Sequence, residues 1–378
     1  MSKGRPPPET KAAAEQAPLF IERAEALGEP AEDPLLLFPA LYGSCVVSFA
    51  ALDGDVVREL AGEFLALAEE RGTTVPLMVG HRITGISLMF TGNIVESRAH
   101  YNQALALYKP AEHRPLATRF GIDAEVAVLI YRSHALWYLG YPEAARADVD
   151  HALENGREMR QTATLMLALT LAGWISIHCR NHTEANAEAQ ELIALAEEKG
   201  ALLWKAYGMM IQGSASTLIG KAADAVEVLT SGITAYRATG ATARMPSYSS
   251  YLARAYAELG QLDDAWRCIG EAMTTTETTK ETWCEAEVNR IAGEIALKSP
   301  ERDAAKAEGY FNRALAVARQ QQAKSWELRA SMSLARLWRD QGKVQQAGEL
   351  LAPVYGWFTE GFDTRDLKEA KALLDVLT

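Results

Sequence analysis

Seven charged side chains in the last third of the sequence could together recognise an anion. A guanidinium group binds a carboxylate or a phosphate through two parallel hydrogen bonds. Five arginines and two glutamates give this set a net charge of 5 − 2 = +3, although the whole chain carries 38 − 49 = −11. The set predicts a surface for an acidic peptide or a phosphorylated ligand, and its members are Arg254, Glu287, Arg290, Glu294, Arg329, Arg336 and Arg339. The alternative is that these arginines pair with neighbouring glutamates or face solvent.

Two further groups of side chains could contact a ligand. The first is mainly aromatic and lies in the N-terminal half, at Arg82, His134, Trp137, Trp174 and Tyr207. Aromatic rings offer flat apolar surfaces to a ligand, but they also serve as packing residues in a core. The second group occupies the insertion described below, at His113, Arg114, Arg119 and Asp123. The alternative there is a loop that covers the hydrophobic end of a neighbouring helix.

The sequence carries no motif for a cofactor, a metal ion or a catalytic mechanism. The string GSASTLIGKA at 213–222 has six rather than four residues between its glycines and no Ser or Thr after Lys221, so it is not a phosphate-binding loop. His178 and His182 have a metal-ligand spacing on a helix, but the repeat described next places a turn between them. We therefore expect no cofactor, no metal ion and no enzymatic activity.

An internal repeat of about 40 residues is the strongest pattern in the chain. Short turns precede amphipathic segments at spacings of 48, 40, 40, 40, 42 and 40 residues, at Gly92, Gly140, Arg180, Gly220, Gly260, Arg302 and Gly342. Five residues after each turn stands a small residue that would let two antiparallel helices approach closely: Ser97, Ala145, Ala185, Ala225, Ala265, Ala307 and Ala347. The pattern indicates an array of helical hairpins.

These features predict an all-α fold, a tetratricopeptide-like right-handed superhelical solenoid of about eight helical hairpins with a C-terminal capping helix. Armadillo and HEAT repeats have similar lengths, but the turn followed by a small residue favours the tetratricopeptide class. We expect a disordered tail at 1–10 and a single solenoid domain at 11–378. Its hairpins are expected at about 35–71, 75–109, 122–156, 162–199, 202–239, 246–277, 282–322 and 325–361, with the capping helix at 364–377.

The repeat also indicates which side chains line the concave face. In tetratricopeptide arrays the first helix of each hairpin forms this face, at residues about 13, 10, 6 and 3 positions before the turn. These offsets place the arginine set and the aromatic set on the concave wall. The 48-residue spacing adds eight residues between the second and third hairpins, in 109–123. Insertions in solenoids collect on one face and often carry binding function.

Composition excludes several classes of protein. With 48% hydrophobic residues the chain can bury enough apolar surface to fold. Its pI of about 5.3 argues against nucleic acid or a membrane as a partner. The uncharged segment 161–179 contains Thr, Ser and His and fits the repeat, so we expect a buried helix there and no membrane span. The spacing of the four cysteines fits neither a disulfide framework nor a zinc site, which favours the reducing cytoplasm.

Long strings of the sequence resemble a known family. Residues 113–145 (HRPLATRFGIDAEVAVLIYRSHALWYLGYPEAA) and 325–374 (SWELRASMSLARLWRDQGKVQQAGELLAPVYGWFTEGFDTRDLKEAKALL) closely resemble the C-terminal tetratricopeptide region of bacterial multidomain signalling proteins. Those proteins carry a class III adenylate/guanylate cyclase domain and an AAA-like, STAND-type ATPase before the repeats. This chain has neither the metal-binding aspartates of the cyclase nor the phosphate loop of the ATPase, so the resemblance implies a sensor or interaction module.

Together these observations favour a non-catalytic helical-repeat module. It would bind a protein segment, which could be acidic, or a small effector, and regulate an attached or partner signalling ATPase or adenylate cyclase. One alternative is a fragment of a parent enzyme that is itself an adenylate/guanylate cyclase with an ATP-binding domain. Another is a free-standing adaptor. The sequence does not indicate an oligomeric state.

Overall fold

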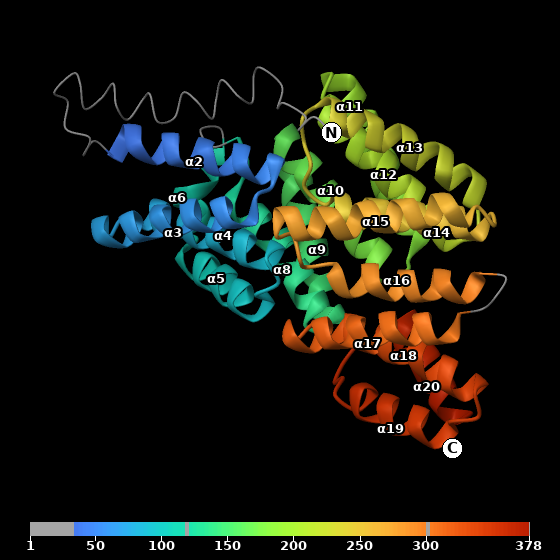
Figure 1. The fold of residues 1–378 in the computed structure, drawn as a ribbon. Coiled ribbons are helices and arrows are strands. Elements are labelled where there is room, and N and C mark those ends of the chain that lie inside the picture. Colours follow the sequence, from blue (N-terminus) through green and yellow to red (C-terminus); the bar gives the residue numbers. More distant parts are fainter. Residues whose placement is uncertain (1–33, 118–120, 300–302, 378) are drawn as a thin grey trace.

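The computed structural model describes residues 34–117, 121–299 and 303–377 of the chain, so the tail expected at 1–10 lies outside the described residues. Within these ranges the protein is 82% helical, with 18 α-helices and no strands, which confirms the predicted all-α class. Figure 1 shows the helices as an array of antiparallel pairs that curves back on itself.

Eight successive helix pairs follow the repeat. Each pair consists of a first and a second helix joined by a short turn. The pairs are α2 (Pro34–Ala51) with α3 (Gly54–Arg71), α4 (Thr74–Phe90) with α5 (Ile94–Leu107), α8 (Ala124–Tyr138) with α9 (Pro142–Glu158), α10 (Thr162–His178) with α11 (His182–Lys199), α12 (Leu202–Leu218) with α13 (Ala222–Ala238), α14 (Met245–Glu258) with α15 (Leu262–Thr279), α16 (Glu285–Lys298) with α17 (Ala304–Gln320), and α18 (Lys324–Asp340) with α19 (Val344–Tyr355). A last helix, α20 (Arg365–Asp375), packs against α18 and α19.

Six of the described turns that join the helices of a pair contain a residue with left-handed backbone. Gly92, Gly140 and Gly260 have φ angles of 83°, 89° and 75°, a region that glycine enters without steric cost. Arg180 takes the same role at φ 57° between α10 and α11. These turn positions were predicted from the repeat and are confirmed, while the predicted turn residue Arg302 lies outside the described residues.

Close approach of the two helices in a pair depends on small residues from both sides. The small residues predicted on the second helices, from Ser97 to Ala347, are all completely buried. The first helices add glycines that face large side chains: a Cβ atom placed on Gly293 would lie 2.4 Å from the Phe311 ring. The backbone of α16 at Gly293 therefore packs directly against the Phe311 ring of α17.

The second half of the solenoid stacks on the first half. Carbonyl groups at the C-terminal ends of α2, α4 and α8 lack an intrahelical partner. They accept hydrogen bonds from residues that lie 192, 192 and 188 positions later in the chain: Thr242 N–H to Ala50 (2.8 Å), Thr282 N–H to Phe90 (2.9 Å) and the Ser325 hydroxyl to Trp137. We refer to these three bonds as the inter-turn contacts. They bring the beginnings of α14, α16 and α18 against the ends of α2, α4 and α8, which fills much of the concave side.

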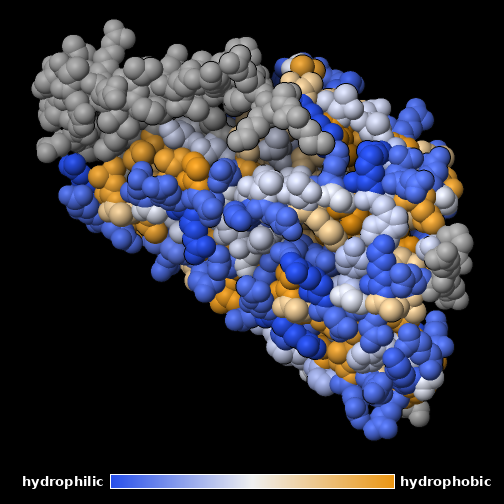
Figure 2. Space-filling model, in the orientation of Figure 1, coloured by the Kyte–Doolittle hydropathy of each residue, from blue (hydrophilic) through white to orange (hydrophobic). Residues whose placement is uncertain are grey.

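The outer surface is mainly polar. Figure 2 shows charged and polar side chains over most of the visible face, with hydrophobic side chains in patches between helices. The uncharged segment forms α10, whose side chains are almost all buried, as predicted. None of the described helices is long and apolar enough to cross a membrane.

Candidate functional site

A cavity of about 230 Å³ remains on the concave side of the first five helix pairs. The first helices α2, α4, α8, α10 and α12 form its walls, and the segment before α14 closes one side. We call it the concave cavity. Its polar and aromatic lining residues are Tyr42, Phe49, Arg82, Phe90, Tyr131, Thr170, Trp204, Tyr207 and Arg244.

Arg82 projects from α4 into the concave cavity, ten residues before the turn at Gly92, as the repeat predicted. Its Nη2 donates to the Tyr42 hydroxyl at 3.0 Å, and its guanidinium lies 5.5 Å from the centre of that ring. Only 5% of the residue is exposed, and its Nε has no hydrogen-bond partner. No acidic residue in the described part of the chain forms an ion pair with it. Such a buried cation is costly unless a negative charge accompanies it.

Arg244 is the second buried cation of the concave cavity, and the repeat offsets did not indicate it. It precedes α14 with a φ angle of 65°, and its guanidinium lies over the rings of Phe90 (5.2 Å) and Trp283 (5.5 Å). The residue is 4% exposed, and its Nη2 has no hydrogen-bond partner. Like Arg82, it makes no ion pair with any acid that the structure describes.

Glu281 holds the backbone of Arg244 rather than its guanidinium. Its two carboxylate oxygens accept the Arg244 N–H at 2.9 and 3.0 Å, and one of them also accepts from Trp283 Nε1 at 2.6 Å. Burial raises the pKa of Glu281 to about 7, although the Trp283 hydrogen bond and Arg244 act in the opposite direction. The carboxyl group therefore positions Arg244 and only partly neutralises it near pH 7.

Hydroxyl groups complete the polar lining. Tyr236 donates its hydroxyl proton to the Ala243 carbonyl at 2.9 Å, so Tyr207 must donate to Tyr236 across their 3.1 Å contact. The Tyr207 oxygen is then left as an acceptor. Burial raises the pKa of Tyr131, and the positive charges of Arg244 and Arg82 both oppose this rise. Both guanidinium groups thus act on one hydroxyl in the same cavity.

Three members of the predicted aromatic set lie in the core instead of the concave cavity. His134, Trp137 and Trp174 are all buried, and Trp137 stacks on His178 with ring centres 4.7 Å apart. His134 contacts the Leu171 carbonyl through Nε2 at 3.0 Å, which makes that nitrogen the protonated one. Burial lowers the pKa of His134 well below its ordinary value. In this structure these rings pack together and with Trp326.

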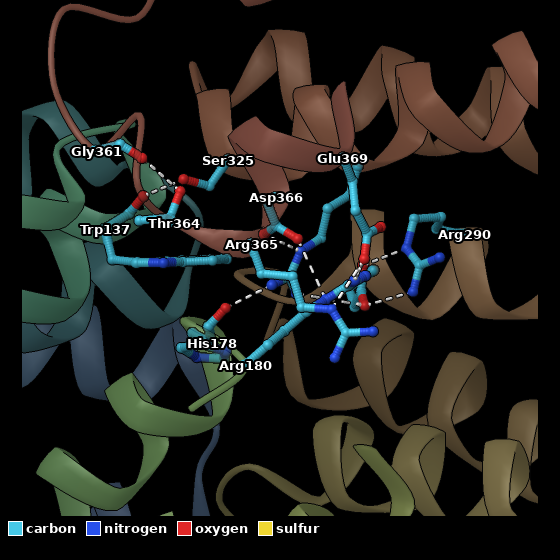
Figure 3. A network of polar contacts seen from close by, with 12 residues as sticks. Trp137, His178, Arg180, Arg290, Ser325, Gly361, Thr364, Arg365, Asp366 and Glu369 are labelled. Carbon is cyan, nitrogen blue, oxygen red and sulfur yellow. Dashed lines mark hydrogen bonds and ion pairs between the residues drawn. The ribbon is translucent and has the colours of Figure 1, made fainter. Parts of the chain in front are cut away.

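Three arginines of the set, Arg290, Arg329 and Arg336, take part in an internal ion-pair network, part of which Figure 3 shows. Arg290 is buried and binds Glu287 through two hydrogen bonds of 2.7 Å, and it also contacts Glu294. Arg329 is equally buried and donates to Asp366 of α20 at 2.7 Å and to the His178 carbonyl. Because α20 supplies its own carboxylates, the charge of +3 counted on the first helices is largely neutralised within the chain.

The remaining arginines lie at the edge of this network. Arg336 contacts Glu369 of α20 at 3.2 Å, and Arg180 joins both Glu369 (3.1 Å) and Asp366 (3.2 Å). Arg254 is half-buried, and its charge helps to lower the pKa of Glu294, which burial alone would raise. Arg339 is exposed and pairs with Asp340.

The insertion forms a short helix, α6 (Pro110–His113), and a 3-10 turn, Arg114–Leu116. His113 accepts the Lys109 N–H through Nδ1 at 2.9 Å, and Arg114 reaches the Asn155 side chain at 3.3 Å. Asp123 caps α8 by accepting the Val126 N–H at 3.0 Å. These contacts fasten the insertion to its neighbours. Arg119 lies outside the described residues.

A second, larger pocket of about 640 Å³ opens on the outer side between α15, α16 and α17. Of the three cations among its lining residues, Arg313 pairs with Glu285 at 3.0 Å, Lys306 lies 4.0 Å from the Trp266 ring, and Lys280 is exposed to solvent. Nowhere in the described ranges do three or more His, Cys, Asp or Glu residues gather in a way that could hold a metal ion. The concave cavity is therefore the candidate in which buried cations have unpaired donors.

Comparison with known proteins supports the fold. No protein-family model and no curated protein matches the chain. A solved Rap protein complexed with Competence and Sporulation Factor aligns with a TM-score of 0.62 and 12% identity, over 98% of this chain and 99% of that one. The Rap conjugation gene regulator of the plasmid pLS20, in complex with the Phr* peptide, aligns with a TM-score of 0.55 and 11% identity, over 98% and 97%. Aspartyl phosphate phosphatase F from Bacillus subtilis aligns with a TM-score of 0.51 and 12% identity, over 94% and 95%.

Proposed function

We propose that the chain is a non-catalytic helical-repeat module that receives a short peptide segment or a small effector in the concave cavity. The observation that carries this proposal is the pair of buried arginines, Arg82 and Arg244, which face one half-open cavity and form no ion pair with an acid among the described residues. A folded protein retains such charges at a cost, and a ligand of opposite charge would offset that cost.

The position of the concave cavity suits a regulatory role. Phe90 lines the cavity, and its carbonyl accepts an inter-turn contact from Thr282. Ala50 lines it too and accepts the contact from Thr242. If the two halves can adopt two arrangements, a ligand that binds one arrangement more tightly would increase its population. In this way binding on the concave side could change the relative position of the two halves.

Peptide binding is supported by the neighbours that share the fold. Two of the Rap proteins named above were solved in complex with a peptide or factor. At 11–12% identity they share the fold with this chain, so a peptide as its own ligand is part of our proposal. The sequence resemblance adds the second part, namely that the module regulates an attached or partner signalling ATPase or adenylate cyclase in the cytoplasm.

Binding can be tested even though the ligand is unidentified. Native mass spectrometry of the chain purified from its own host should reveal a bound species that denaturation releases. Ala50→Phe places a ring in the concave cavity and should abolish this adduct. The matched control is Ala51→Phe on the exposed neighbour, which should retain it. A wild-type protein without any adduct, or an adduct retained by Ala50→Phe, would refute binding in the concave cavity.

The non-catalytic part of the proposal has its own test. The homogeneous chain is assayed for ATP turnover, for cyclic-nucleotide production and, because one neighbour is named a phosphatase, for hydrolysis of an aspartyl phosphate. We expect no activity in any assay. Turnover that persists through purification to homogeneity would contradict the module and favour an enzyme.

An acidic peptide remains a second ligand that we propose for the arginine set. It would have to displace Asp366 and Glu369 of α20 from Arg329 and Arg336. A glutamate-rich peptide titrated at low and high salt should then bind wild type more tightly at low salt, because partly exposed charges are screened. Equal affinity for wild type and for the variant Arg290→Ala, Arg336→Ala would assign these arginines to the fold alone.

A further inference from the structure

We infer that the concave cavity binds an organic oxyanion, a carboxylate or phosphate group carried on an apolar body of the size of one or two amino-acid residues. This inference rests on the proposed function and names the chemical class of the ligand.

The charge of the cavity indicates an anion. Arg82 and Arg244 contribute two guanidinium groups, and none of the described residues that line the cavity is acidic. Arg82 Nε and Arg244 Nη2 are buried donors without an acceptor in the described structure. A guanidinium group prefers oxyanions because its planar N–H groups match two oxygen atoms at once. The two unpaired donors therefore point to a carboxylate or a phosphate rather than to a neutral group.

The rest of the lining indicates an apolar body. Most other lining residues are aliphatic or aromatic, and Phe49, Phe90 and Trp204 supply ring surfaces. The Thr170 hydroxyl donates within its own helix to the Met166 carbonyl at 2.8 Å, so it is not left as a donor for a ligand. A cavity of about 230 Å³ is smaller than the roughly 300–1,000 Å³ that drug-sized ligands occupy. The ligand is thus small, or it is the end of a longer chain.

The same arginines could instead serve the fold, as Arg290 does. Arg290 has two carboxylate partners, Glu287 and Glu294, whereas Arg82 and Arg244 have none among the described residues. Loss of Arg290 removes the close cationic partner of the buried Glu287, whose other ion pair, with Arg329, spans 3.9 Å. Loss of Arg82 leaves no described acidic partner behind. Loss of Arg244 removes a positive charge that lowers the pKa of Glu281, but that carboxyl group keeps its bonds from the backbone N–H of residue 244 and from Trp283 Nε1. Either substitution removes a buried charge. The two roles therefore predict opposite effects of substitution on the ligand-free protein.

The experiment measures melting temperatures of the whole chain with a fixed set of probes. The probes are 3-phenylpropanoate, phenethyl phosphate, the neutral 3-phenylpropanamide, and the peptide acetyl-Gly-Phe with a free or an amidated carboxyl terminus. The free-acid and peptide arms distinguish a metabolite from a peptide end, and the phosphate arm distinguishes the two oxyanions. At about ten times its Kd, an oxyanion probe should raise the wild-type melting temperature by about 2 °C. The amides should raise it less.

Three variants decide the role of the arginines. Arg82→Met with Arg244→Met should melt no lower than wild type without ligand and should lose at least ten-fold in probe affinity. Arg82→Lys with Arg244→Lys keeps both positive charges but lacks the planar guanidinium groups, so it should bind the probes more weakly than wild type. This variant provides a result even if the methionine variant does not fold. Arg290→Met is the matched control and should melt far lower.

Two results would overturn the inference. One is that no oxyanion probe raises the wild-type melting temperature, and the other is that wild type and the methionine variant are protected equally. If the amides bind as tightly as the acids, the oxyanion class is wrong but a ligand site remains. If no probe binds and native mass spectrometry finds no adduct, the proposed function fails as well.

Discussion

The backbone N–H of Thr282 donates to the carbonyl of Phe90, 192 residues earlier in the chain, across 2.9 Å. The backbone N–H of Trp283 also donates to this oxygen, at 3.3 Å. The Phe90 ring meanwhile lines the concave cavity beneath the Arg244 guanidinium. Phe90 thus belongs both to the contact between the two halves and to the cavity. Movement of its ring would therefore change the geometry of the hydrogen bond from Thr282.

Hydrogen exchange should reveal these contacts directly. Thr242 and Thr282 precede α14 and α16, where N–H groups would exchange quickly if they faced solvent. We expect their exchange to be as slow as that of the helices beside them, because each N–H bonds to a carbonyl of the other half.

A pair of tryptophan variants serves to challenge this prediction. Trp326→Ala removes a buried ring that packs on Trp137 and Tyr138, which should cost about 3–5 kcal/mol and accelerate exchange at Thr282. Trp357, which is 36% exposed, offers the control Trp357→Ala, with little expected effect at that site. Fast exchange at Thr282 in wild type would mean that the two halves do not stack in solution.

Glycines inside the helices should differ sharply in their tolerance of alanine. A methyl group on Gly293 would lie 2.4 Å from the Phe311 ring, so Gly293→Ala should overpack the α16 and α17 pair by about 1–3 kcal/mol. Gly270 in α15 has no atom within 4 Å of the same position. Gly270→Ala should therefore stabilise the protein by up to about 1 kcal/mol, because alanine has the higher helix propensity.

Chemical denaturation of both glycine variants checks this contrast. The control matters because both changes add the same methyl group to a helix interior. If Gly293→Ala were as stable as Gly270→Ala, the two helices would be farther apart than the structure places them.

The fold could be predicted from the sequence because its determinants are local. A turn at Gly140 and a small residue at Ala145 fix how the two helices of a pair meet, and these residues recur at nearly constant spacing. The concave position of Arg82 and Tyr207 followed from the same register. Each of these predictions needs only the repeat period and the handedness of an α-helix.

The contacts between the two halves and part of the candidate site depend on distances along the superhelix, and no local sequence pattern encodes these distances. The contact of Thr282 with Phe90 requires a certain rotation per pair, which accumulates over several repeats. Arg244 stands in a left-handed turn before α14, outside the helical offsets that located Arg82. The neutralisation of Arg329 by Asp366 was missed because the charge count covered first helices only, and α20 supplies that carboxylate.

Two arginines of the network should contribute very differently to stability. Arg290 is buried and bridges Glu287 and Glu294. Arg290→Ala leaves the buried Glu287 with only its longer contact to Arg329 (3.9 Å) and removes the ion pair of Glu294, so it should cost about 3–5 kcal/mol. The Arg336 side chain is 39% exposed, and Glu369 is its ion-pair partner among the described residues, so Arg336→Ala should cost about 0–1 kcal/mol. Urea unfolding at constant salt measures both. Similar losses for the two variants would show that burial does not govern this network.

The last prediction concerns how stability depends on pH through Glu281. In the folded protein burial raises the pKa of this carboxyl group to about 7, whereas an exposed glutamate has a pKa of 4.5. Between these two values the folded state binds more protons than the unfolded state. The free energy of unfolding must therefore fall as the pH rises from about 4.5 to about 7, and it stays at the lower level above that.

Glu281→Gln isolates this effect, because a neutral amide can keep the bonds from Arg244 N–H and Trp283 Nε1 through one oxygen. The difference between wild type and Glu281→Gln, measured by urea unfolding from pH 5 to pH 9, should change by on the order of 2–3 kcal/mol, with the variant gaining relative stability as the pH rises. Other titrating groups, such as the buried His134, are common to both proteins and cancel in the difference. A difference that stays constant over this range would mean that Glu281 is already ionised in the folded protein at pH 5. In that case Arg244 would have a full negative charge beside it, and its need for an anionic ligand would be weaker than we infer.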